Sequence, residues 1–89
     1  MNNNSFIQGE LMKTILSTWS KEVKKAMIDA DMDTTDLANK FNYTRQYVSS
    51  IINGKNYYAE AVQQISNYFN IPIPSEKATL AKKKENEKN

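Results

Sequence analysis

The 89-residue sequence contains no cysteine and no histidine. Their absence excludes disulfides, thiol nucleophiles, zinc fingers and imidazole bases. No apolar run approaches the roughly 18 residues of a membrane span, and the start MNNNSF lacks the charged and apolar regions of a signal peptide. No pair of carboxylates stands in a context that forms a pocket. We therefore expect one small cytoplasmic domain that is not an enzyme, uses no metal or cofactor and binds no membrane.

Apolar residues recur at helical spacing along the first third of the chain. This periodicity predicts helix from about Glu10 to Ala30, either as one long helix or as two that break near Ser17-Thr18, where a hydroxyl could cap a new start. One stripe of this segment is expected to form the core of an added helix, or else a dimer or partner interface. Its residues are Leu11, Ile15, Leu16 and Trp19.

Two short helices are predicted next, separated by Asn42-Tyr43. Asp33 can cap the first, which carries Leu37, Ala38 and Phe41 inward. Asn42 suits a left-handed turn residue, and Thr44 can cap the second helix, which runs to Asn53 before Gly54. Two helices joined this tightly are expected to cross steeply, as in a helix-turn-helix. The outward side chains of the second helix are all polar and none is acidic, namely Arg45, Gln46, Ser49 and Ser50.

The remaining segments complete an all-α class without strand patterns. A helix is predicted from about Tyr58 to Phe69, and prolines then interrupt the chain. A short last helix is expected to reach about Lys82, followed by a charged end without apolar residues that should fray. The predicted organisation is a flexible tail (1–9), a helix-turn-helix domain with an N-terminal helical extension (10–74), and a short helix with a charged flexible tail (75–89).

The stretch from Val23 to Ile71 resembles the phage repressor/Cro-type (XRE) helix-turn-helix family. The resemblance rests on Leu37-Ala38, on a capped helix ending in Asn53-Gly54-Lys55, and on the Tyr68-Phe69-Asn70-Ile71 segment. It implies a compact domain of four to five helices whose helix 44–53 lies in the major groove of double-stranded DNA.

Three features at four positions depart from that family's pattern. Asn42 replaces the usual turn Gly, which a left-handed Asn tolerates. Thr34 replaces a Gln that often touches a phosphate. Met27 and Ile52 stand where some members pair an Arg with a Glu, and an apolar pair can replace a buried ion pair at no net cost.

Carried over by position, the resemblance implies two groups of DNA contacts. Arg45, Gln46, Ser50 and Ser49 would face base edges, because arginine suits guanine and glutamine suits adenine. A second group would hold phosphates and position the domain; its members are Thr34, Lys40, Thr44, Asn53, Lys55, Asn56 and Tyr57.

The net charge of +2 is small for a protein that binds DNA, but it is unevenly distributed. From Leu37 to Ala59 there are three cations and no acid. The lysine run at 82–84 is expected to be a solubilising tail, or else an arm on the DNA backbone. We therefore expect a sequence-specific transcription regulator, a repressor of phage or mobile-element type that binds as a homodimer. The alternative is a protein-interaction module, such as an antirepressor or antitoxin that binds another regulator. Thr34, the low net charge and the apolar N-terminal helix favour it.

Overall fold

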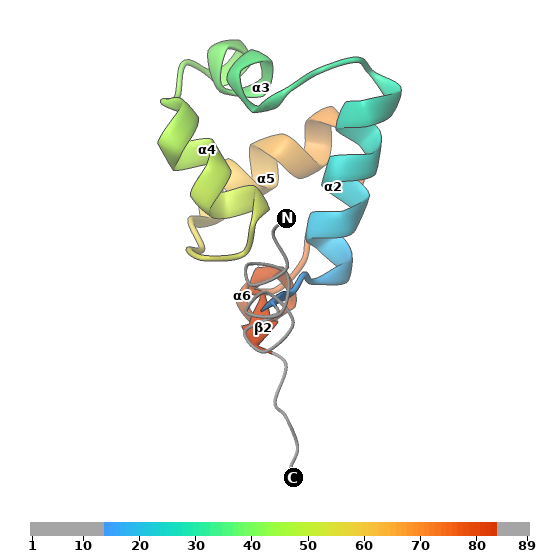
Figure 1. Cartoon of the computed structure of the whole chain (residues 1–89), viewed down its shortest axis with the longest axis vertical. Helices are drawn as coiled ribbons and strands as arrows, with labels where there is room; N and C mark the ends of the chain where they lie inside the picture. The colour runs from blue at the N-terminus through green and yellow to red at the C-terminus, as the bar shows by residue number, and fades with distance from the viewer. Residues whose placement is uncertain (1–13, 84–89) are drawn as a thin grey trace, which may run out of the picture.

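A computed structural model describes residues 14–83, and the chain there forms five helices and one pair of short strands (Figure 1). The predicted helical class with a helix-turn-helix is therefore confirmed. Predictions for residues 1–13, including Leu11 and a helix start at Glu10, lie outside the described residues. The elements are β1 (Thr14–Ile15), α2 (Thr18–Asp29), α3 (Thr34–Phe41), α4 (Arg45–Ile52), α5 (Ala59–Tyr68), α6 (Glu76–Thr79) and β2 (Lys82–Lys83).

The first described helix begins at Thr18, so a helix that runs unbroken from Glu10 to Ala30 is wrong. Ser17 has extended backbone and its side chain accepts a hydrogen bond from the Ser20 amide, which makes Ser17 the N-cap of α2. The predicted capped helix start at Ser17-Thr18 is thus confirmed, but Thr14 and Ile15 before it form a strand and not the end of a first helix. Ile15, predicted on the helical stripe, lies instead on β1 and is 44% exposed.

The core lies between α2, α3, α4 and α5. Each of these helices contributes one apolar face, formed by residues at helical spacing, to this shared core. The burial of these four faces stabilises the fold. Met27 and Ile52 are both buried, as apolar replacements of an ion pair should be. The buried set comprises Trp19, Val23, Met27, Leu37, Ala38, Val48, Ile51, Ile52, Ala61, Val62 and Ile65.

The helix-turn-helix is built by local capping on both sides of its turn. The Asp33 side chain accepts from the Asp36 amide while the Asp36 carboxylate accepts from the Asp33 amide, which closes a capping box at the start of α3. Asn42 then adopts the left-handed conformation (φ 61°), and Thr44 accepts from the Tyr47 amide to begin α4. These caps confirm the turn that the sequence predicts.

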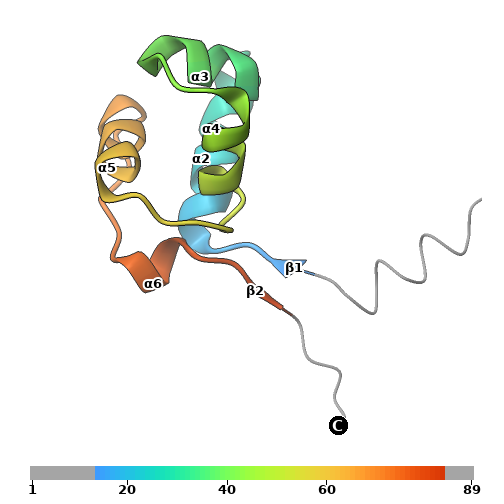
Figure 2. The ribbon, with the colours of Figure 1, turned by 90° about the vertical axis from the view of Figure 1, so that its left-hand side faces the viewer.

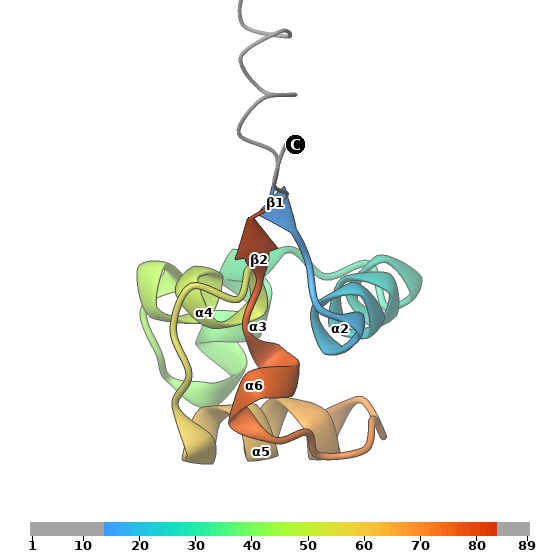
Figure 3. The same cartoon turned by 90° about the horizontal axis from the view of Figure 1, so that it is seen from below.

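The C-terminal part of the described chain packs back onto α2. Thr79 of α6 is fully buried, and its carbonyl accepts a hydrogen bond of 3.1 Å from the Ser17 hydroxyl. Three residues further along the chain, β2 begins and pairs antiparallel with β1, with Thr14 opposite Lys83 and Ile15 opposite Lys82. Figure 2 shows α6 and β2 following one another below α5, and Figure 3 shows the β1 and β2 arrows side by side between α4 and α2. The sequence predicted no strand, and Lys82 and Lys83 were expected to fray.

No helix within residues 14–83 is both long and apolar enough to cross a membrane.

Candidate nucleic-acid interface

The outward face of α4 carries the side chains that the sequence singles out. Val48, Ile51 and Ile52 turn one face of the helix into the core. Arg45 and Gln46 occupy the first turn on the opposite side and are both exposed. A guanidinium and an amide therefore stand together at the N-terminal end of α4, where the backbone amides add partial positive charge.

Ser49, Ser50 and Asn53 are only partly exposed, and their side chains form hydrogen bonds within the helix itself. The Ser50 hydroxyl donates to the Tyr47 carbonyl at 2.8 Å. The Asn53 amide donates to the Ser49 carbonyl at 2.9 Å and to the Ser49 hydroxyl at 3.2 Å. These residues line the same face as Arg45 and Gln46, but their side chains are already held by intrahelical bonds.

The start of α3, where Thr34 is a predicted phosphate contact, is acidic. Thr34 is partly exposed, and it follows Asp33 directly. Hydrogen bonding from the Asp36 amide holds the pKa of Asp33 below its usual value, so this carboxylate stays charged. The capping box therefore fills the helix terminus with carboxylate oxygens at the place where Thr34 would meet a phosphate.

An aromatic row ties α3 and α4 to α5. It consists of Tyr68, Phe41, Tyr43, Tyr47 and Tyr58, and successive ring centroids lie 4.8–6.2 Å apart. The Tyr43 hydroxyl also donates to the Gln64 side chain, and desolvation raises the pKa of Tyr43. Lys40, a predicted phosphate contact, has its ammonium 4.9 Å from the Tyr68 ring centroid, so its charge faces α5.

The other predicted phosphate contacts are Thr44, exposed at the N-cap of α4, and three residues of the loop after α4. Lys55 and Asn56 are exposed, and both of their backbone amides donate to the Ser50 carbonyl, at 2.9 and 3.2 Å. Tyr57 is half-buried against the core. Gly54 makes the turn with φ +74°, a conformation that favours glycine.

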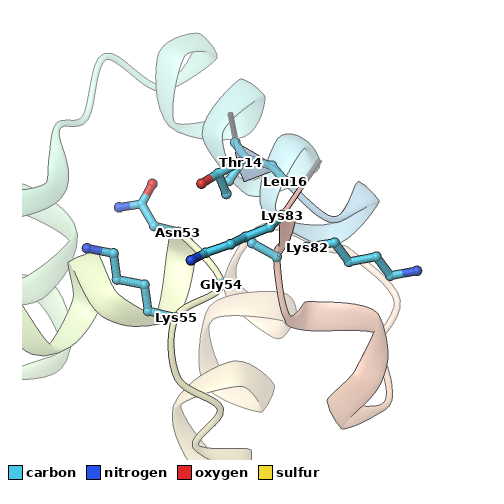
Figure 4. A pocket seen from close by; sticks show the side chains of 8 residues that line it. Thr14, Leu16, Asn53, Gly54, Lys55, Lys82 and Lys83 are labelled. Carbon is cyan, nitrogen blue, oxygen red and sulfur yellow. The ribbon is translucent and has the colours of Figure 1, made fainter. Parts of the chain in front are cut away.

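A pocket beside this loop contains lysines that the sequence reasoning assigned to a tail. The pocket is lined by Thr14, Leu16, Asn53, Gly54, Lys55, Ala81, Lys82 and Lys83, and it is shown in Figure 4. Strands of two residues show no alternating pattern, so the sequence did not predict the β1–β2 pair that borders this pocket. The lysine run at 82–84 was the feature of the sequence that could have drawn attention to it. The described residues hold no cluster of three or more side chains able to bind a metal ion.

A helix with a polar, acid-free outward face that follows a capped tight turn is the geometry of a helix-turn-helix. The comparisons agree: a family model described as the Cro/C1-type helix-turn-helix DNA-binding domain matches residues 22–76. The chain belongs to this family, which confirms the resemblance drawn from the sequence. Searches of curated proteins and of solved structures gave no match.

Proposed function

We propose that the protein is a sequence-specific regulator of transcription, a repressor of phage or mobile-element type that reads the major groove with α4. The observation that carries the proposal is the exposed pair Arg45 and Gln46 at the start of α4. Side chains at this end of a recognition helix reach base edges, and arginine and glutamine can each make two hydrogen bonds to one purine. The family supports DNA binding in general.

The roles of the other residues follow from their hydrogen bonds. Ser49 and Ser50 would contact bases from a helix face that is already ordered, so little side-chain entropy is lost on binding. The phosphates on either side of the bases read by α4 would be held by Thr44, Asn53, Lys55, Asn56 and Tyr57. Thr34 and Lys40 are the weaker members of the proposed set, because one adjoins two carboxylates and the other faces an aromatic ring.

We further propose that the regulator acts as a homodimer on a two-fold operator. One helix reads only a few base pairs, and two copies are needed to distinguish an operator from a genome. With Lys40, Arg45 and Lys55 in each copy, a dimer would neutralise about six phosphates and log Kd would change with log salt with a slope of roughly 5.

The test is selection of a duplex from a random library, followed by titration of the selected and a scrambled duplex. Arg45→Ala with Gln46→Ala should abolish the preference for the selected duplex, a loss of about 30-fold or more if each residue discriminates by 1–3 kcal/mol. The control, Lys25→Ala with Gln63→Ala, removes one positive charge and one glutamine amide from exposed positions on α2 and α5 and should keep the preference.

Two outcomes would contradict the proposal. In one, selection enriches no sequence and the protein binds another regulator instead, which is the protein-interaction alternative. In the other, the double variant on α4 discriminates as well as the control does. A strictly monomeric protein on the selected duplex would refute the homodimer alone.

A further inference from the structure

We propose that Lys83, on β2, binds a phosphate of the DNA backbone together with Lys55, so that the β1–β2 pair is part of the DNA interface. The proposal rests on the DNA-binding function proposed above and adds a residue that the helix-turn-helix itself does not contain. Lys83 lies beyond residues 22–76, the part of the chain that matches the family.

A backbone contact fixes β2 next to the loop that follows α4. The Ala81 amide donates to the Gly54 carbonyl at 3.0 Å, immediately before β2 begins. A side chain at position 54 would meet the Ala81 nitrogen at 2.5 Å, so the close approach needs glycine. Lys83 is therefore held near Lys55 by the fold, although the two residues are far apart in sequence.

The alternation of side chains along β2 separates its two lysines. Successive residues of a strand point to opposite sides, and Figure 4 shows that Lys83 extends toward Asn53 and Lys55 while Lys82 extends away from them. Thr14, the partner of Lys83 in the register, points its hydroxyl to the same side as Lys83. Two ammonium groups, a hydroxyl and an amide thus border one pocket.

The charge around α4 also favours a phosphate at this place. At the start of α3 two carboxylates close the capping box, whereas the residues that line the pocket beside Gly54 include Lys55 and Lys83 and no acid. A polyanion that lies along α4 is therefore attracted at the loop after α4 rather than at the start of α3. Lysine binds phosphate as a point charge, so Lys83 would position the DNA without reading its sequence.

The test compares Lys83→Gln with Lys82→Gln, a matched pair of exposed neighbours that point to opposite sides. The salt dependence of binding is measured on the selected and on a scrambled duplex. Lys83→Gln should reduce the slope of log Kd against log salt by about 0.9 for each bound protomer, on both duplexes equally. Lys82→Gln should leave the slope unchanged, and Lys83→Arg should retain it.

Several outcomes would overturn the proposal. Equal slopes for Lys83→Gln and Lys82→Gln would show that only net charge matters. If millimolar inorganic phosphate shifts the amide resonances of Gly54 and Lys83 while Lys83→Gln leaves the salt slope intact, the pocket binds a free phosphate instead. If the wild type binds the selected and the scrambled duplex equally well, the proposed regulator function is refuted. The difference in salt slope between Lys83→Gln and Lys82→Gln on scrambled DNA still decides the role of Lys83.

Discussion

The two sides of α4 are held by different means and carry opposite charge. On the α3 side, the chain uses side-chain caps within a few residues of each other, namely the Asp33 and Asp36 carboxylates at the start of α3 and the Thr44 hydroxyl at the start of α4. On the β1–β2 side, a backbone hydrogen bond joins Gly54 to Ala81, and the nearby charges are lysines. Figure 1 places α3 at one end of the molecule and β2 at the other, with α4 between them. The comparison teaches that local sequence orients α4, whereas a long-range contact supplies charge beside it.

The largest effect is expected on the β1–β2 side, from Gly54→Ala. The new Cβ would meet the Ala81 nitrogen at 2.5 Å in a backbone with φ +74°. Left-handed strain and overpacking together should lower the free energy of unfolding by roughly 2–4 kcal/mol. Urea unfolding followed by the fluorescence of Trp19, the sole tryptophan, measures this loss. Asn56→Ala, at an exposed site in the same loop, is the control, and equal midpoints for the two variants would refute the importance of the Gly54–Ala81 contact.

A smaller effect is expected on the α3 side, from Asp33→Asn. Because the pKa of Asp33 is lowered in the folded state, its charge stabilises the fold above its usual value of 3.8. That contribution is lost as pH falls through the lowered pKa. Asparagine can still cap the helix but does not titrate in this range, so the variant should lose less stability than the wild type when the pH falls below about 4. Thermal unfolding at a series of acidic pH values measures the difference, and parallel curves would contradict the capping role of the charge.

The smallest effect is expected from Asp31→Asn, which tests whether acids near α3 repel DNA. Asp31 is exposed and has φ 57°, a conformation that asparagine also adopts readily. Removing this charge should tighten DNA binding about twofold at low salt and have no effect at high salt. Filter binding at the two salt concentrations, with Glu22→Gln on α2 as the control, measures it. Equal affinities for Asp31→Asn and the wild type at low salt would show that the α3 side lies too far from the DNA for its charge to matter.

The sequence was sufficient for the parts of the fold that depend on neighbouring residues. Asp33, Asn42 and Thr44 are typical cap and turn residues, and the helix-turn-helix forms where they predict it. The inward positions Leu37, Val48 and Ile51 are fully buried, because they follow the helical period.

The features that the sequence did not predict depend on contacts between distant residues. The extended backbone at Thr14–Ile15 is set by pairing with Lys82–Lys83, and no local pattern specifies that pairing. The spacing of the apolar residues around Ile15 instead predicted a helix, which is wrong at Thr14–Ile15. Lys40 is another example, since its position over Tyr68 depends on how α5 packs against α3.

The register of β1 and β2 also determines how the domain would respond to mechanical force. Thr14 and Lys83 form the outer pair, so tension applied at both ends of the described chain would open the strands one pair at a time rather than slide them past each other. Opening the strands in this way needs little force, because each step breaks only one residue pair. Unfolding the helices needs more force, because they share one core and unfold together. Tension would therefore detach the lysines of β2 from α4 first and leave the helix-turn-helix folded.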